Sequence, residues 1–247
     1  MDARTFDKSK LPSRHVTEGP SRAPHRSYYY AMGLTEEQIH RPFVGVVSCW
    51  NEAAPCNIAL MRQAQSAKKG VDAAGGTPRE FCTITVTDGI AMGHQGMKSS
   101  LVSREVIADS VELTMRGHCY DALVGLAGCD KSLPGMMMAM VRLNVPSIFI
   151  YGGSILPGSY RGRQITVQDV FEAVGQHSVG AISDADLLEV EQSACPRPAR
   201  AARSSRPTRW PRSPRRSALR CPIPAVRQRP TKCATASISR AARRSWS

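Results

Sequence analysis

The strongest constraint on the fold is a rhythm of short apolar runs that alternate with longer helical patterns. The runs are rich in β-branched residues, and a loop and then a helical pattern follow each of them. They cover residues 42–48, 81–86, 121–127 and 145–151. Four strand–loop–helix units of this kind predict an α/β fold, a parallel sheet covered by helices on both faces (an α/β/α sandwich), because parallel strands need a crossover between them.

Helical patterns fill the segments that follow these runs. They predict helices over residues 58–74, 99–116 and 134–143 and a last helical region over 166–191. In the polar residues 1–39, we expect a short helix around residues 28–32 and the start of another at Thr35. We therefore expect a polar segment over 1–39, an α/β domain over 40–195 and an Arg/Pro/Ser-rich tail over 196–247.

The net charge of +13 comes from the tail alone. Residues 1–195 contain 18 Lys and Arg against 20 Asp and Glu, a balance of −2, whereas residues 196–247 contain 15 Lys and Arg and no acidic residue. We therefore expect no specific nucleic-acid partner for the domain, although a basic arm that binds nucleic acid is one interpretation of the tail.

The chain contains no apolar stretch of the roughly 18 residues that span a bilayer, and its start lacks the apolar core of a secretory signal. We therefore expect a cytoplasmic protein with no membrane partner. Eight cysteines in 247 residues are too few for a disulfide scaffold. Cysteines in loops are then candidate metal ligands or reactive thiols.

Residues capable of chemistry follow each predicted strand. In parallel sheets, function gathers in the loops beyond the carboxyl ends of the strands. In chain order these loops carry Cys56, then Asp88 and His94, then Cys129, Asp130 and Lys131, and finally Ser154. We therefore expect two thiols, two carboxylates and a lysine to meet at one edge of the sheet.

The segment Gly128-Cys129-Asp130-Lys131 places a thiolate ligand beside a carboxylate ligand. Thiolates select iron–sulfur, zinc or copper, and carboxylates suit magnesium or manganese, so the loop indicates two adjacent metal centres. The alternative is a buried cysteine followed by a helix-capping aspartate. Cys56 leaves a similar choice between a thiolate favoured at a helix start and a small core residue.

For each remaining candidate residue, an ordinary structural role is the alternative to a role in binding or chemistry. Asp88 lies in a glycine-spaced loop that either lets the backbone approach a ligand or forms an ordinary turn. His94 is a candidate ligand or proton carrier, although a single loop histidine more often serves neither purpose. The methionines of residues 136–140 favour core packing over a cofactor contact. Packing is also the interpretation for three cysteines beside apolar runs: Cys49, Cys82 and Cys119.

Several long motifs in the same order resemble the N-terminal third of the dihydroxy-acid/phosphogluconate dehydratase family. The resemblance covers residues 12–195. It rests on Ser13-Arg-His-Val-Thr-Glu-Gly, Trp50-Asn-Glu-Ala-Ala-Pro-Cys-Asn, Thr87-Asp-Gly-Ile-Ala-Met-Gly-His-Gln-Gly-Met, Ser103-Arg-Glu-Val-Ile-Ala-Asp-Ser, Gly128-Cys-Asp-Lys and Ser193-Ala-Cys-Pro. It implies a hydro-lyase, and the sequence around Cys56 resembles the branch of the family that holds a [2Fe-2S] cluster.

The resemblance also implies roles for the candidate residues. Cys56 and Cys129 would be ligands of the [2Fe-2S] cluster, and Asp88 and Asp130 would bind Mg2+. Lys131 would bind Mg2+ as a carbamate, which supplies the anionic oxygen that a protonated lysine lacks. The implied reaction removes water from a 2,3-dihydroxy-3-methyl acid to give a 2-oxo acid in valine and isoleucine synthesis. A Lewis acid would assist departure of the hydroxyl group.

The resemblance stops after Cys195-Pro196. By the resemblance, the third cluster cysteine, the serine that acts as catalytic base and a glutamate ligand of magnesium lie beyond this point, so no catalytic residue is assigned in this chain. We therefore expect a truncated, inactive form with a disordered tail. Suitable codons for the tail, read in the neighbouring frame, give family-like segments, so we hypothesise a base deletion near codons 196–197 that sequencing of the gene would test.

The sequence leaves the oligomeric state and two alternative functions open. Family members are homodimers, although the sequence does not indicate whether this chain retains that interface. A sugar-acid dehydratase of the phosphogluconate type is the alternative enzyme, and a substrate panel would separate the two. An iron-binding or redox module without catalysis is a third interpretation, which a stable cluster without turnover would support.

Overall fold

The sheet of the computed structural model, which describes residues 6–195, has four parallel strands in the order β2-β1-β3-β4. The strands are β1 (Phe43–Ser48), β2 (Thr77–Cys82), β3 (Ala122–Ala127) and β4 (Ser147–Tyr151). The central strands β1 and β3 are buried along their whole length, as their uninterrupted apolar sequences predict. The predicted tail over 196–247 lies outside the described residues.

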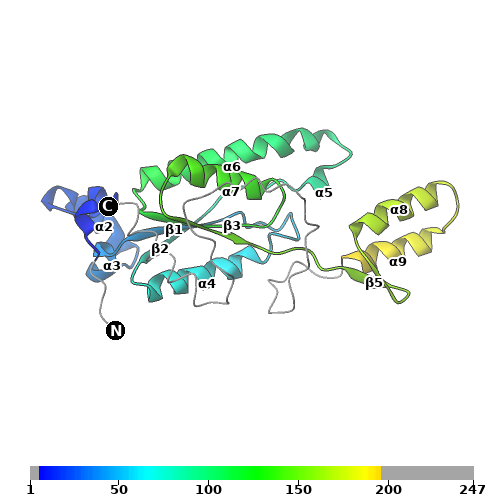
Figure 1. The fold of residues 1–247 in the computed structure, drawn as a ribbon, viewed down its shortest axis with the longest axis horizontal. Helices are drawn as coiled ribbons and strands as arrows, with labels where there is room; N and C mark the ends of the chain where they lie inside the picture. The colour runs from blue at the N-terminus through cyan, green and yellow to red at the C-terminus, as the bar shows by residue number, and fades with distance from the viewer. Residues whose placement is uncertain (1–5, 196–247) are drawn as a thin grey trace, which may run out of the picture.

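Helices cover both faces of this sheet (Figure 1). Helix α4 (Leu60–Ala73) lies on one face, where it contacts β1, β2 and β3. Helices α6 (Lys98–Gly117) and α7 (Ser132–Leu143) pack against each other on the opposite face. The predicted α/β/α sandwich is therefore confirmed.

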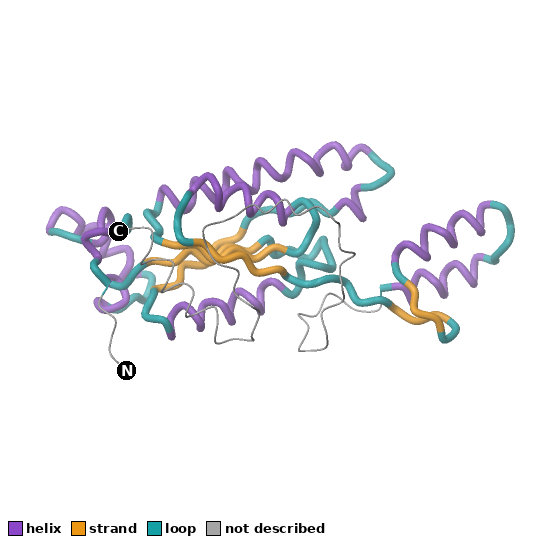
Figure 2. The backbone as a smooth tube through the Cα atoms, in the orientation of Figure 1, coloured by secondary structure: helices purple, strands orange, loops and turns teal. Residues whose placement is uncertain are grey.

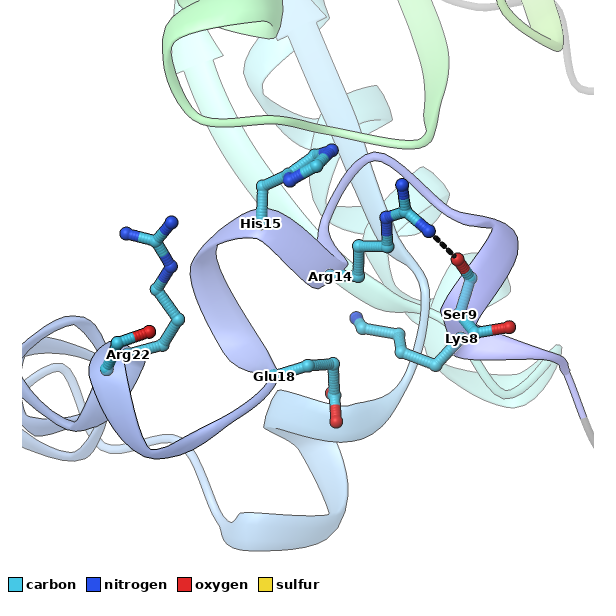
Figure 3. A pocket seen from close by; sticks show the side chains of 7 residues that line it. Lys8, Ser9, Arg14, His15, Glu18 and Arg22 are labelled. Atoms are coloured by element: carbon cyan, nitrogen blue, oxygen red, sulfur yellow. Dashed lines mark hydrogen bonds between the residues drawn. The ribbon is translucent and has the colours of Figure 1, made fainter.

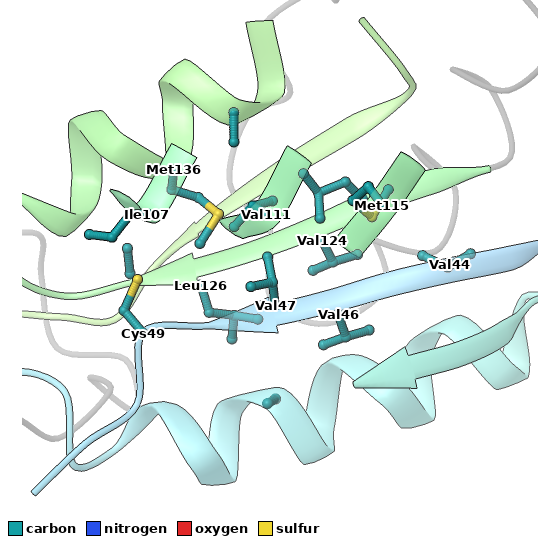
Figure 4. Packing of buried hydrophobic residues seen from close by; sticks show 14 of the residues in the cluster. Val44, Val46, Val47, Cys49, Ile107, Val111, Met115, Val124, Leu126 and Met136 are labelled. Carbon is teal, nitrogen blue, oxygen red and sulfur yellow. The ribbon is translucent and has the colours of Figure 1, made fainter. Parts of the chain in front are cut away.

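The core fills the space between the sheet and both helical layers (Figure 4). Leu60 and Val71 come from α4, and Ile107 and Val111 come from α6. Met136 of α7 is fully buried in the same cluster, so core packing is confirmed for this methionine. The sheet is therefore packed between helices on both of its faces.

The second strand begins and ends earlier in the chain than the sequence predicts. The apolar run over 81–86 favoured a strand there, whereas β2 covers Thr77–Cys82. Strand β2 lies at the edge of the sheet, where the missing N–H of Pro78 removes no ladder bond that the sheet needs. The pairing ends after Thr83, whose N–H donates to the Ser48 carbonyl, and the chain then enters the loop that carries Asp88.

The single helical region predicted over 166–191 is two helices. Helix α8 (Val167–Ser178) ends near Gly180, whose φ of 74° lies in the left-handed region that favours glycine. Helix α9 (Asp184–Ala194) begins with a capping box in which Ser183 and Asp186 bond each other's backbone N–H groups. The turn between the helices lets them pack side by side.

A hairpin that the sequence analysis did not predict precedes these helices. Strands β5 (Gly158–Tyr160) and β6 (Arg163–Ile165) are antiparallel, and both residues of the turn, Arg161 and Gly162, have positive φ. The hairpin and the two helices form a lobe that projects beside the sandwich (Figure 2). Its own small apolar cluster comprises Ile165, Ala173, Val190 and Ala194.

The N-terminal segment packs at the edge of the sheet where the strands begin. It contains η1 (Lys8–Lys10), α1 (Arg14–Thr17), η2 (Pro20–Arg22), α2 (Ala23–Ala31) and α3 (Glu36–His40). The predicted helix start at Thr35 is confirmed, with a complete capping box. The helix predicted at residues 28–32 begins earlier, with Pro24 in its first turn.

Asp121 fastens this segment to the sheet. Its carboxylate accepts hydrogen bonds from the Ser13 N–H at 2.8 Å, the Ser13 hydroxyl at 2.5 Å and the Phe43 N–H at 2.8 Å. Asp121 is only 4% exposed, and burial raises the pKa of its carboxyl group against the opposing effect of the Ser13 donors. One carboxylate therefore joins α1 to the starts of β1 and β3.

No helix within residues 6–195 is both long enough and apolar enough to cross a membrane.

Candidate metal centre

Two buried thiols meet at the carboxyl edge of the sheet. Cys56 lies in the loop between β1 and α4, and Cys129 lies in the loop between β3 and α7. Their Sγ atoms are 3.0 Å apart, and the residues are 8% and 6% exposed. The sheet therefore brings the two cysteines together as the order of the loops predicts.

A glycine allows the two loops to approach so closely. A Cβ atom on Gly128 would lie 2.4 Å from the Cys56 carbonyl oxygen and 2.7 Å from Asn57 Oδ1, closer than real contacts allow. On the other side, the Ser132 hydroxyl accepts from the Cys129 N–H at 3.0 Å and so holds the loop against the start of α7. Gly128 therefore allows the close approach of the two loops, and Ser132 holds the Cys129 loop in place.

The two thiols differ in acidity because one donates to the other. The Cys56 S–H donates to Cys129 Sγ, which lowers the pKa of the Cys129 thiol, and the nearby Thr87 hydroxyl acts in the same direction. The same hydrogen bond, together with burial, raises the pKa of Cys56. Cys129 is therefore the thiol that ionises first, and thiolates are the form that binds metals.

Next to the thiols, a lysine bridges two carboxylates. Lys131 Nζ forms ion pairs with Asp88 Oδ2 and, at 2.7 Å, with Asp130 Oδ2. Asp88 belongs to α5 (Asp88–Ala91), and its other oxygen accepts from the Ser100 hydroxyl of α6. Hydrogen bonds to the carboxylates raise the pKa of Lys131, and Asp130 has a larger effect than Asp88. Burial opposes ionisation of Asp88, but Lys131 and Ser100 lower the pKa of its carboxyl group.

The thiol pair and the carboxylate group form one continuous site. Cys129, Asp130 and Lys131 are consecutive, and Thr87, which precedes Asp88, has its Oγ1 atom 3.3 Å from Cys129 Sγ. All five residues selected from the sequence are therefore brought to the same edge.

Two other loop residues do not join the site. Both ring nitrogens of His94 are engaged within its own loop, with the Ile90 carbonyl at 2.9 Å and the Gly96 N–H at 3.0 Å. Those bonds support the interpretation that His94 is neither ligand nor proton carrier. Ser154 is exposed and contacts the Tyr151 hydroxyl at 3.0 Å.

Among residues 6–195, no other cysteine sulfur is in hydrogen-bond contact with Cys56 or Cys129. Cys49 is fully buried, so the packing interpretation is confirmed for it. The same interpretation is wrong for Cys82, which is exposed because it ends the edge strand β2. Cys119 is half-buried and has a positive φ of 54°.

The side chains of the site suit two kinds of metal group, but they supply only part of the ligand shell of each. Two thiols in contact suit a shared thiophilic group, and two carboxylates suit a hard divalent cation. The Lys131 ammonium lies between the carboxylates, where it neutralises them as a cation would. Within residues 6–195, no three side chains of the His, Cys, Asp and Glu types converge on one point. The described residues therefore supply pairs of ligands rather than a complete shell.

A separate basic hollow of about 450 Å³ lies on the N-terminal segment (Figure 3). Lys8, Arg14, His15 and Arg22 line it together with Glu18. Backbone carbonyls already engage two of these cations: Lys8 Nζ donates to the Arg41 carbonyl at 2.7 Å, and Arg14 donates to the Ser9 carbonyl. The hollow lies beside Ser13, at the strand-start edge that Asp121 fastens, and not at the carboxyl edge.

Three supporting hydroxyl groups were missed by the sequence analysis. Thr87 contacts the Cys129 sulfur, Ser100 donates to Asp88, and Ser132 holds the Cys129 backbone. Ser100 and Ser132 lie in the first turns of α6 and α7, where serine is common for local reasons. No local pattern therefore distinguishes their roles at the site.

The fold and this edge define a parallel α/β protein with a thiol–carboxylate site. The family model described as "Dihydroxy-acid/6-phosphogluconate dehydratase N-terminal" matches residues 41–200, more than half of the chain. The chain belongs to the dihydroxy-acid/6-phosphogluconate dehydratase family.

Curated relatives show the same similarity over a longer stretch. The chain is 87% identical over 196 residues to "Dihydroxy-acid dehydratase 2" of Mesorhizobium japonicum, which is 79% of this chain and 33% of that protein. It is 83% identical to the dihydroxy-acid dehydratase of Parvibaculum lavamentivorans and 53% identical to that of Metallosphaera sedula, over 34% of each. The chain thus spans about a third of the length of the curated relatives it matches.

Proposed function

We propose that residues 6–195 form the metal-binding N-terminal part of a dihydroxy-acid dehydratase. The observation that supports the proposal is the meeting of Cys56, Cys129, Asp88, Asp130 and Lys131 at one sheet edge. The substrate class is a small 2,3-dihydroxy-3-methyl acid of valine and isoleucine synthesis, and the reaction is loss of water to a 2-oxo acid. The location proposed for this chemistry is the cytoplasm.

In this proposal Cys56 and Cys129 hold the [2Fe-2S] cluster. When bound, the cluster supplies a Lewis acid for the departing hydroxyl group. Cys129 contributes the more acidic thiol, and Thr87 stabilises its thiolate by a hydrogen bond. Burial leaves only a small part of either cysteine exposed to solvent, and Gly128 lets the two loops approach.

Asp88, Asp130 and Lys131 hold Mg2+ in the same proposal. The two aspartates supply anionic oxygens, and Ser100 orients Asp88 through its second oxygen. Lys131 binds metal only after its ammonium loses protons and its nitrogen takes up carbon dioxide, because an ammonium group has no lone pair. The neighbouring carboxylates favour the ammonium until a cation replaces its charge.

Anaerobic reconstitution of the full chain with iron and sulfide tests the thiol ligands. We expect visible circular dichroism from a protein-bound cluster in the parent chain, because only bound iron–sulfur chromophores are chiral. Each of Cys56→Ser and Cys129→Ser is expected to lose the signal, since serine cannot supply a thiolate. The cluster is expected to be labile on desalting, because the pair supplies only two thiolates.

The matched control is Cys82→Ser, which removes an exposed thiol outside the pair and is expected to keep the signal. Equal cluster signals in all three variants would overturn the assignment of the ligands. Turnover of 2,3-dihydroxy-3-methylbutanoate by the reconstituted chain is expected to be negligible, because the chain spans only about a third of its relatives. Readily measured turnover would contradict that expectation.

A further inference from the structure

The contact between Cys56 and Cys129 has a consequence in the absence of the cluster. Their sulfur atoms are 3.0 Å apart, about 1 Å farther than a disulfide bond requires. We propose that in the cluster-free chain these two thiols are the site of reversible oxidation to a disulfide, which blocks metal loading. The effect on loading rests on the proposed function, whereas the oxidation itself rests on the geometry of the pair.

The loops already hold the two sulfur atoms about 1 Å from bonding distance. Gly128 directly precedes Cys129, and its missing side chain lets this loop touch the carbonyl of Cys56. The loop of Cys129 is fixed by Ser132, and that of Cys56 by Asn57, whose amide donates to the Cys49 carbonyl at 2.7 Å. Sulfur atoms brought this close by fixed loops need only small side-chain rotations to bond.

Burial selects the oxidant. The two residues are 8% and 6% exposed, so a bulky disulfide such as oxidised glutathione has poor access to either sulfur. Hydrogen peroxide is small enough to reach them, and we name it as the oxidant. Cys82, an exposed thiol, has no cysteine sulfur in hydrogen-bond contact among the described residues.

The reaction with peroxide balances in two steps. The Cys129 thiolate attacks one peroxide oxygen, the O–O bond breaks, and the products are a sulfenic acid on Cys129 and one water after proton uptake. The Cys56 sulfur then attacks the Cys129 sulfur, its proton leaves with the hydroxyl group, and a second water forms. Overall, two thiols and one peroxide give one disulfide and two waters.

The test uses the full chain, purified without cluster under reducing conditions, freed of reductant and treated with hydrogen peroxide. Non-reducing peptide mass spectrometry is expected to show a linked pair of peptides that contains Cys56 and Cys129. The linked pair should disappear on reduction. In Cys56→Ser, Cys129 should remain as a sulfenic acid that dimedone traps, while Cys82→Ser should leave the linkage unchanged.

Two results would overturn the inference. The first is that Cys56 and Cys129 stay open to alkylation in denaturant after the exposed thiols have been oxidised. The second is that either cysteine is found linked to a different cysteine of the chain. Both readouts are independent of catalysis.

Cluster loading separates this inference from the proposed function. The oxidised chain is expected to take up no cluster until a reductant cleaves the disulfide, after which visible circular dichroism should return. A chain that forms the linkage but never binds a cluster when reduced would refute the proposed function alone. A chain that binds a cluster when reduced but forms no linkage would refute the disulfide alone.

Discussion

The Asp121→Ala variant is expected to lose about 3 kcal/mol of unfolding free energy, because three buried donors lose their acceptor. These donors are the Ser13 N–H, the Ser13 hydroxyl and the Phe43 N–H. Burial raises the pKa of Asp121 because its charge is poorly solvated. Removal of this buried charge therefore offsets part of the stability that the lost hydrogen bonds cost. Urea denaturation followed by far-ultraviolet circular dichroism measures the difference.

Asp72→Ala is the matched control for that experiment. Asp72 pairs with Arg41 on the surface, with its side chain 58% exposed, and surface pairs contribute at most about 1 kcal/mol. A loss for Asp121→Ala no larger than that of Asp72→Ala would mean that Asp121 does not fasten the N-terminal segment to the sheet.

The Asp88→Asn variant is expected to bind Mn2+, used as a paramagnetic probe of the proposed magnesium site, at least about tenfold more weakly than the parent. The amide keeps the size of the side chain but removes the negative charge that a hard cation prefers. It also weakens the ion pair with Lys131. Titration followed by electron paramagnetic resonance, in buffer that contains bicarbonate, measures free Mn2+ directly.

Asp109→Asn provides the comparison for Mn2+ binding. Asp109 also pairs with a basic residue, Arg142, but lies on the exposed surface of α6 with its side chain 60% exposed. Its replacement is expected to leave Mn2+ binding unchanged. If both variants bind Mn2+ as the parent does, Asp88 is not a ligand.

The central part of the fold follows from local sequence, and its edges do not. Strands β1 and β3 are uninterrupted apolar runs, so their burial on both faces could be predicted. Strand β2 begins at Thr77 and contains Pro78, which only an edge position tolerates, and sequence alone does not indicate which strand is at the edge. The hairpin turn at Arg161-Gly162 was missed because arginine is uncommon at a position with positive φ.

For the candidate site, the sequence likewise indicates the main residues but not the contacts that hold them in place. Cys56, Asp88 and Cys129 could be selected because each follows a predicted strand, and the topology of parallel sheets brings such loops together. The contacts that hold them could not be predicted, because they join segments that are distant in the chain. Ser13 and Asp121, for example, are 108 positions apart, and no local pattern connects them.

X-ray diffraction at the iron and manganese absorption edges gives the most direct test of the central claim, that one sheet edge holds both metals. Crystals would be grown from the full chain after anaerobic loading with iron, sulfide and Mn2+. We predict an iron peak beside the sulfur atoms of Cys56 and Cys129 and a neighbouring manganese peak among Asp88, Asp130 and Lys131. An iron peak on other cysteines, or manganese bound away from Asp88, would contradict the account.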